Sequence, residues 1–307
     1  MRLSLGPIHY FWERERVFEF YRQAARWPVD IVYLGEVVCS KRRELGHDDW
    51  LGIASELADA GKEVVLSTLA LVEAASDLAS MRRTIGNGRF AIEANDMAAV
   101  NMARGRARFV VGPHINCYNA DTLEVLARAG ATRWVPPIEL DSDTVAQLHA
   151  ARPRAMQTEV IAFSRLPLAL SARCFTARAH NTGKDDCGLR CRDDPDGMRL
   201  RTQDGDALFT INGVQVLSAR TCNLAAAVLE MKQVGIDVLR LSPQPRDMEA
   251  IVTVFRSAAN GTLAPADAAE RLVRYAPDGA CNGYWHAQPG MRWVVCAATP
   301  ERRGVDG

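Results

Sequence analysis

Three cysteines lie close together in a polar segment of the sequence: Cys174, Cys187 and Cys191. The segment 174–195 reads CFTARAHNTGKDDCGLRCRDDP, and it carries so many charges that its thiols cannot serve merely to fill a core. Structural zinc usually takes its ligands from paired C-x2–4-C turns, and only Cys187 and Cys191 could form such a pair. Iron–sulfur clusters accept thiolates from scattered loops. The spacing therefore favours an iron–sulfur cluster, with zinc and unligated or redox-active thiols as the alternatives.

The composition is that of a globular chain and argues against several classes of function. Of the 307 residues, 48% are apolar and 24% are charged, which is enough to bury a large core. Lys and Arg total 37, as do Asp and Glu, so a net charge of zero provides no overall field to attract nucleic acid or anionic lipid. No run approaches the roughly 18 apolar residues of a membrane span, and the first residues lack the apolar core of a signal peptide. We therefore expect a cytoplasmic protein whose eight cysteines do not form four disulfides.

Short apolar, β-branched runs alternate along the chain with segments of helical periodicity. The runs begin at Leu3, Ile31, Val64, Phe90, Phe109, Trp134, Gln157 and Val238. The periodic segments include residues 50–60, 123–129 and 144–151. Such alternation implies right-handed crossovers and a parallel sheet. Eight units predict an α/β fold of the (β/α)8 TIM-like barrel type. The main alternative is a doubly wound sheet, which is weakened because no Gly-rich phosphate-binding motif follows the first run.

One gap between these runs is much longer than the others. Successive runs begin 19 to 33 residues apart, whereas 81 residues separate Gln157 from Val238. We therefore predict an insertion after the seventh strand that holds all three clustered cysteines. Within it, Asn212 and Gly213 predict a tight hairpin, and the segment 224–234 predicts a helix. The expected division is a barrel over 1–260 with a cluster-binding insertion at 164–222, followed by a C-terminal extension over 261–307 that packs on the barrel.

The loop after the second predicted strand brings a fourth cysteine to the same face. In TIM barrels the loops that follow the strands form the face that carries the active site. The seventh loop with its insertion opens on this face, as does the second loop, EVVCSKRR, with Cys39. Cys39 therefore completes a possible set of four thiols, and Cys222 is its main competitor. Nearby cations would help to offset the negative charge of a thiolate-bound cluster; they are Arg173, Arg178, Lys184, Arg190 and Arg192.

Polar side chains also follow several of the predicted strands. They are Glu36, Glu93, Asn95, Asp96, His114, Asn116, Glu139 and Glu159. A carboxylate or imidazole at the barrel mouth could act as an acid or base, or could orient a polar substrate. For any single residue a hydrogen-bonded polar belt is the better interpretation, and we expect His114 to support the site rather than to act as the catalyst. As a set, these residues mark the functional face.

Three segments resemble the collagenase-like peptidase family. They are GPHINCYNADTLEVLARAGATRWVPPIEL (112–140), EVIAFSRLPLALSARCFTAR (159–178) and CNGYWH (281–286). The resemblance covers residues 1 to about 295 and is greatest to the UbiV branch, which serves ubiquinone biosynthesis. The UbiU and UbiV members are not known for proteolysis, and this chain contains neither G-x-S-x-G nor H-E-x-x-H. Relatives carry an ECFAF-like segment that reads EVIAF here, a departure that changes no expected ligand.

The resemblance implies a 4Fe–4S cluster held by Cys39, Cys174, Cys187 and Cys191. It also implies a heterodimer with a UbiU-like paralogue and oxygen-independent hydroxylation of the ring of a prenylated quinone precursor. A small UbiT-like lipid-binding accessory protein would present this substrate, which would let a protein without a membrane span act on it. Peptidase activity is not expected. The aromatic segment 283–286 is expected to cap the barrel, with contact to a partner or a substrate ring as the alternative.

Two other functions stay open at this point. Other members of the family hydroxylate RNA, although the zero net charge and the lack of a basic, aromatic-rich stripe argue against nucleic acid as a partner. The chain could also be a non-catalytic subunit that bears a cluster and stabilises its paralogue, because the catalytic residues could belong wholly to that partner.

Overall fold

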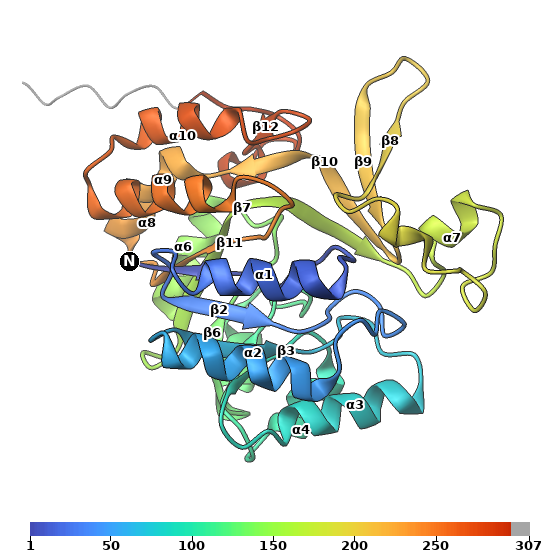
Figure 1. Cartoon of the computed structure of the whole chain (residues 1–307). Coiled ribbons are helices and arrows are strands. Elements are labelled where there is room, and N and C mark those ends of the chain that lie inside the picture. Colours follow the sequence, from blue (N-terminus) through green and yellow to red (C-terminus); the bar gives the residue numbers. More distant parts are fainter. Residues whose placement is uncertain (296–307) are drawn as a thin grey trace, which may run out of the picture.

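Eight parallel strands form a closed barrel in the computed structural model, which describes residues 1–295 (Figure 1). The strands are β1 (Arg2–Leu5), β2 (Ile31–Leu34), β3 (Glu63–Ser67), β4 (Ala91–Ala94), β5 (Phe109–Val111), β6 (Ala131–Trp134), β7 (Gln157–Leu170) and β11 (Val238–Leu241). They pair in chain order, and β11 closes the barrel by pairing with both β7 and β1. The predicted TIM-like barrel is therefore confirmed. The last residues of the predicted extension, 296–307, lie outside the described residues, and so does Cys296.

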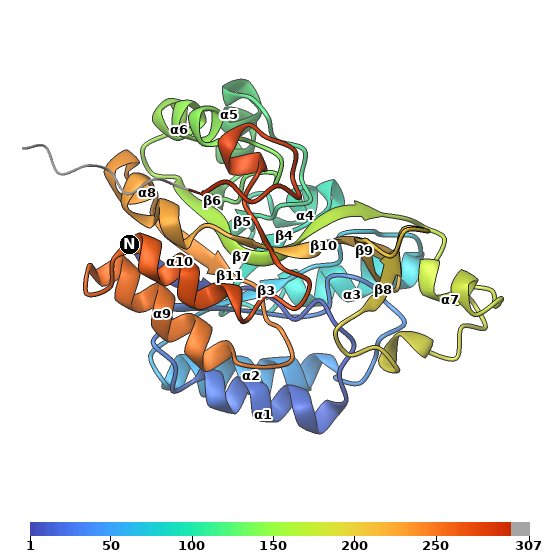
Figure 2. The same cartoon turned by 90° about the horizontal axis from the view of Figure 1, so that it is seen from above.

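Helices surround the barrel between successive strands (Figure 2). They are α1 (Arg14–Ala24), α2 (His47–Asp59), α3 (Ala75–Ile85), α4 (Met97–Ala103), α5 (Ala120–Arg128), α6 (Ser142–Ala151), α8 (Val228–Val234) and α9 (Met248–Asn260). Asp96, Asn119 and Asp141 precede α4, α5 and α6, and each side chain accepts a hydrogen bond from a backbone N–H of the first turn. The helix predicted at 224–234 begins as a 3-10 turn, Ala225–Ala227, before it continues as α8.

The sixth strand ends where the sequence predicted it to begin. β6 covers Ala131–Trp134, whereas the apolar run was predicted to start at Trp134 and to continue through Pro136 and Pro137. Proline lacks the N–H that a central strand must donate to its neighbour. The residues after Trp134, with their two prolines, therefore form the connection that leaves β6, and the strand consists of Trp134 and the three less apolar residues before it.

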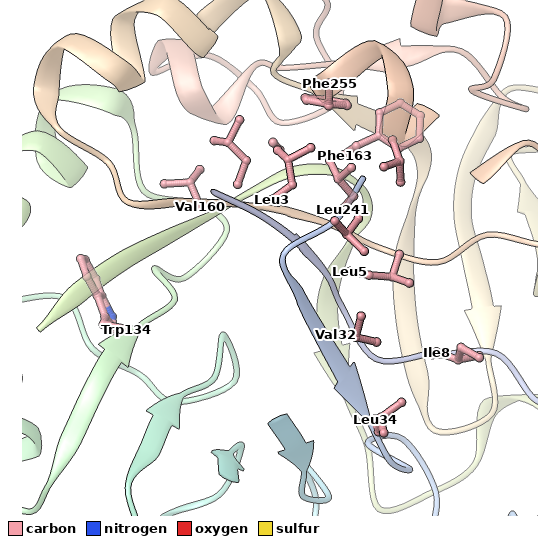
Figure 3. Packing of buried hydrophobic residues seen from close by; sticks show 14 of the residues in the cluster. Leu3, Leu5, Ile8, Val32, Leu34, Trp134, Val160, Phe163, Leu241 and Phe255 are labelled. Carbon is pink, nitrogen blue, oxygen red and sulfur yellow. The ribbon is translucent and has the colours of Figure 1, made fainter. Parts of the chain in front are cut away.

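Alternate residues of the strands pack on opposite sides of the barrel wall. Ile31 and Tyr33 of β2 belong to one small buried cluster, while Val32 and Leu34 belong to the large cluster that includes residues of the surrounding helices. Figure 3 shows Val32 and Leu34 in this outer layer, beside β1 and its buried leucines. Phe163 packs edge-to-face on Phe255 of α9, with the ring centroids 6.0 Å apart (Figure 3). The period of two thus separates a barrel interior from an outer hydrophobic layer.

The insertion after the seventh strand is present, as the sequence predicted. β7 continues past the barrel and pairs antiparallel with β10 (Gln215–Asn223). Between them lie α7 (Phe175–Ala179), β8 (Met198–Arg201) and β9 (Ala207–Asn212). In Figure 1 these elements lie to one side of the barrel, on the side to which the β2 arrow points. The predicted hairpin joins β9 to β10, and its turn contains Gly213 at a φ of 66°.

The chain after α9 packs on the long β10 strand. It forms α10 (Pro265–Val273) and β12 (Ala280–Cys281), and β12 pairs parallel with β10. Trp285 is buried in the large hydrophobic cluster. The division into barrel, insertion 164–222 and extension 261–307 stays a prediction. Within residues 1–295, no helix has both the length and the apolar character needed to cross a membrane.

Candidate functional site

Three of the four predicted ligand cysteines pack against one small apolar cluster beside the barrel mouth. Cys39 comes from the loop after β2, whereas Cys174 and Cys187 come from the insertion between β7 and β10. All three thiols belong to this cluster or pack on it, and we name it the thiol cluster; its apolar members are Val38, Leu170, Ala177 and Val214. The second loop and the insertion, more than 130 residues apart in the sequence, therefore meet in space.

The fourth predicted ligand, Cys191, lies beside Cys174. It belongs to a 3-10 helix of one turn, Arg190–Arg192, and interacts electrostatically with Cys174. Cys174 is the N-cap of α7, and its Sγ accepts a hydrogen bond from the backbone N–H of Ala177 at 3.4 Å. Burial raises the pKa of the Cys191 thiol and that of Cys39. A metal that binds them would therefore displace protons, as thiolate ligation requires.

Two lysines tie the insertion to its surroundings next to these thiols: Lys41 of the second loop bonds to the insertion, and Lys184 of the insertion pairs with Glu73 in the loop after β3. Lys41 Nζ donates to the backbone oxygen of Lys184 at 2.9 Å and to Asp185 Oδ1 at 2.7 Å. Lys184 Nζ donates to the backbone oxygen of Ala172 at 3.0 Å. Both ammonium groups thus lie in segments that carry the cysteines, where positive charge would offset thiolate charge. Lys184 was expected from the sequence to have this role, whereas Lys41 was missed.

Arg42 is the buried cation of the site. Its guanidinium donates to the backbone oxygen of His9 at 2.7 Å and to Asn212 Oδ1 at 2.8 Å, and it lies 3.9 Å from Glu36 Oε1. It also opposes the rise in the pKa of Cys191. Sequence reasoning missed this residue, although three consecutive cations, which begin two residues after Cys39, were a usable signal.

The donor set consists of thiols, the ligand type that iron–sulfur clusters take. In the described part of the chain, no group of three or more His, Cys, Asp and Glu side chains is arranged to hold one metal ion. The seven described cysteines form no disulfide with one another. An iron–sulfur cluster is wider than one ion and takes thiolates from separate positions. Four free thiols from two loops, with cations beside them, provide donors of the type that such a group needs.

Cys222, the predicted competitor of Cys39, lies in a different part of the molecule. It is on β10 in register with Cys281 of β12, and both are buried in the large hydrophobic cluster. Burial raises the pKa of Cys222 well above its usual value, and the adjacent Cys281 adds to this effect. Of the two candidates, Cys39 is the one that the structure brings to the thiol cluster.

Two of the predicted acid–base carboxylates are used inside the barrel. Glu159 accepts hydrogen bonds from Ser4 Oγ at 2.6 Å, from the Tyr33 hydroxyl at 2.5 Å and from Arg240 Nε at 2.7 Å. Glu93 accepts from Arg240 Nη1 at 2.6 Å. These buried groups satisfy one another, so the polar-belt interpretation holds for both carboxylates. Arg240 Nη2 is buried without a hydrogen-bond partner among the described residues.

The other strand-end carboxylates organise local backbone or contact one neighbour. Glu36 Oε1 accepts hydrogen bonds from the backbone N–H of Val38 at 2.8 Å and of Cys39 at 3.0 Å, so it shapes the loop that presents this thiol. Asp96 begins α4 as its N-cap. Glu139 accepts a hydrogen bond from the hydroxyl of Tyr118. None of the three contacts identifies an acid–base catalyst.

Two uncharged histidines lie at the mouth of the barrel. The ring centroids of His9 and His114 are 6.4 Å apart. Burial is the largest cause that lowers the pKa of His9 to about 3 and that of His114 to about 4, so both imidazoles are neutral near pH 7. The Nε2 atom of His114 is buried and has no hydrogen-bond partner in the described structure. His9 was missed in the sequence, although GPIHY directly follows the first strand.

Two cavities adjoin the loops at this face of the barrel. One, of about 470 Å³, is lined by residues of α2, α3 and the second loop, including Trp50, Ser80 and Arg42. The other is a cleft of about 190 Å³ lined by His114 and by residues that follow β6 or belong to the outer end of β7. Both adjoin segments that reach the thiols, through Arg42 and Leu170 respectively.

Known proteins resemble the chain in sequence and in fold. The family model described as peptidase family U32 matches residues 16–294. The structure of the U32 peptidase Mk0906 is 9% identical, with a TM-score of 0.45, over 80% of this chain and 94% of that one. Dihydropteroate synthase from Thermus thermophilus is 14% identical, with a TM-score of 0.43, over 85% of this chain and 93% of that one. A mutant tryptophan synthase α-subunit from Pyrococcus furiosus is 11% identical, with a TM-score of 0.42, over the same shares. Because the family model matches most of its length, the chain belongs to peptidase family U32, a family of enzymes.

Proposed function

We propose that this protein is an iron–sulfur protein of the UbiV type, which hydroxylates the ring of a prenylated quinone precursor without oxygen, together with a UbiU-like paralogue. The observation that supports it most is the meeting of Cys39, Cys174 and Cys187 at the thiol cluster, with Cys191 beside Cys174. Thiols placed in this way by two distant segments have no role in filling the main core. The resemblance of three sequence segments to the UbiV branch supplies the substrate class.

The chain's own residues have distinct roles in this proposal. Cys39, Cys174, Cys187 and Cys191 would hold the 4Fe–4S cluster. Glu36 holds the second loop through its hydrogen bonds to the backbone N–H groups of residues 38 and 39. The apolar side chains of the thiol cluster limit water around the sulfur atoms, and Lys41, Lys184 and Arg42 lower the cost of concentrating negative charge. When bound, a cluster of this kind supplies one-electron chemistry at the barrel mouth.

An anaerobic assay with the paralogue tests the function directly. The chain and its UbiU-like paralogue are purified together without oxygen and given a prenylated quinone precursor, presented by a UbiT-like protein. We expect a hydroxylated ring product, detected by mass spectrometry. The Cys187→Ser variant should form none, while Cys281→Ser, whose thiol lies in the hydrophobic core, should retain product formation.

Three outcomes would oppose the proposal. Product formed at full rate by the Cys187→Ser complex would remove the cluster from the reaction. Equal product from the paralogue alone would make this chain an accessory subunit.

In cells, deletion of the gene should abolish ubiquinone synthesis without oxygen and leave aerobic synthesis intact. Normal anaerobic ubiquinone together with a hydroxyl group missing from RNA would favour the RNA-modifying alternative.

A further inference from the structure

The cleft at His114 has the size of a site for one ring. Its volume of about 190 Å³ is below the roughly 300–1,000 Å³ of pockets that enclose a drug-sized ligand, yet it is several times the volume of a water molecule. Several of the residues that line it are apolar and stiff, namely Pro113, Pro137, Ile138, Pro167 and Leu168. Asn116, Tyr118 and Glu139 also line the cleft, so its walls suit a flat body that bears polar groups, while a long flexible tail would have to leave it.

One residue that lines the cleft has a polar atom without a partner. His114 lines the cleft, and its Nε2 is buried without a partner in the described part of the chain. A buried polar atom without a hydrogen bond is costly, and such an atom in a native protein calls for an explanation. A neutral imidazole carries one N–H and one lone pair, so Nε2 can hydrogen-bond to a hydroxyl or a carbonyl oxygen. A ligand oxygen at this position would satisfy it.

The charges of the cleft disfavour an anionic ligand. Among the described residues that line it there is no Lys or Arg, and the one ionisable carboxylate is Glu139. Burial, together with the neighbouring Arg240, lowers the pKa of His114 to about 4, so the imidazole adds no positive charge at neutral pH. A carboxylate or phosphate would therefore be poorly held here. A neutral ring that bears an oxygen fits both the walls and the charges.

The cleft also adjoins the thiols. Leu170, at the end of β7, lines the cleft and packs on the thiol cluster with Cys39, Cys174 and Cys187. The cleft and the thiol cluster therefore share the side chain of Leu170.

We propose that this cleft binds the neutral phenol or quinone ring of the substrate, with a ring oxygen hydrogen-bonded to Nε2 of His114. The identity of the ring rests on the proposed function, whereas the placement of the site rests on the cleft and the unpartnered nitrogen. His114 is then a residue that binds and orients substrate, a more direct role than the supporting one expected from the sequence.

Binding of 2-allylphenol tests the placement, because this soluble phenol carries the first three carbons of a prenyl-like tail. Its dissociation constant is measured by calorimetry on the full chain in complex with the paralogue. We expect His114→Leu to weaken binding by about tenfold, as the loss of one hydrogen bond with a buried partner predicts. His114→Gln, whose amide nitrogen can occupy the place of Nε2, should stay within about threefold of the wild type. Ala169→Trp, at an exposed position lining the cleft, should abolish binding by filling it.

A matched variant addresses the larger cavity as the competing site. Ser80 is exposed and lines the cavity of about 470 Å³, so Ser80→Phe should fill that cavity and leave phenol binding unchanged. Loss of binding in Ser80→Phe, with His114→Leu and Ala169→Trp unaffected, would overturn the placement. The Cys187→Ser complex separates this inference from the proposed function. If it binds 2-allylphenol normally and wild-type protein forms no quinone product, the proposed function fails while the ring site stands.

Discussion

The cysteine that completes the thiol set can be identified by iron content. Cys39 packs with Cys174 and Cys187, while Cys222 packs with Cys281 in the hydrophobic core. Protein prepared without oxygen should contain about four iron and four sulfide per chain. Cys39→Ala should lose nearly all of this iron, as Cys187→Ala should, because each removes one ligand. Cys222→Ala, the matched control, should keep it.

The same metal analysis can also contradict the predicted cluster or its fourth ligand. Stoichiometric zinc without sulfide would rule out the cluster. Loss of iron in Cys222→Ala, with iron retained in Cys39→Ala, would mean that the described arrangement of the thiols changes when the cluster binds.

The neutral histidines make stability depend on pH. The folded-state pKa of His9 is about 3 and that of His114 about 4, both below the usual 6.5, because burial disfavours the charged imidazole. Between pH 6.5 and about 4 the unfolded chain therefore binds protons that the folded chain does not, and stability falls as the pH falls. Each histidine contributes at most about 1.4 kcal/mol per pH unit. His114, Arg240 and Arg42 act on His9 in the same direction as burial.

Urea unfolding at pH 7, 6, 5 and 4 measures this dependence. The free energy of unfolding should decline over that range, and His9→Gln should show a shallower decline, because one of the two protonations has been removed. An unchanged slope in His9→Gln would show that His9 is protonated equally in both states.

At the scale of elements, the end of β2 depends on a glycine. Gly35 has a φ of 122°, and a Cβ there would lie 2.7 Å from the backbone oxygen of Ser67 on β3. Gly35→Ala should destabilise the protein by about 2–4 kcal/mol, from backbone strain and from a contact that a backbone atom cannot relieve. It should also lower iron content, because the loop that follows β2 carries Cys39. Thermal unfolding and iron analysis measure both effects.

Gly61→Ala is the matched control for this variant. Gly61 follows α2 with a φ of 80°, and a Cβ there would meet nothing within 4 Å. It should cost only about 1 kcal/mol and leave the iron content unchanged. Equal effects of the two substitutions would show that the contact with β3 has no influence on the loop.

Most elements could be predicted from the sequence, and the exceptions have physical reasons. Seven strands lie at the predicted runs because buried parallel strands need continuous β-branched residues. β6 was misplaced because the apolar run after it contains two prolines. β8 was not predicted, since its residues MRLR are mostly exposed and show no apolar alternation. Cys39 could be placed from the order of the loops alone, whereas the contacts of Arg42 and the closeness of His9 to His114 depend on side-chain packing across the barrel.

At the scale of the whole molecule, the partner is the main prediction. The resemblance implies a UbiU-like paralogue, and the neutral chain has no excess charge to oppose association. Co-expression should give a one-to-one complex, and light scattering after gel filtration should find one copy of each chain. A chain that is monomeric in the presence of the paralogue, and fully active alone, would contradict the heterodimer.

The polar network inside the barrel has a consequence for how the chain is made. Glu93 is synthesised long before Arg240, which pairs with it, and Glu159 takes hydrogen bonds from Ser4 and Tyr33 on the first two strands. A barrel without β11 would leave both carboxylates without the charge of Arg240, at a cost of several kcal/mol. The closed barrel therefore gains its full stability during translation only after β11 has left the ribosome.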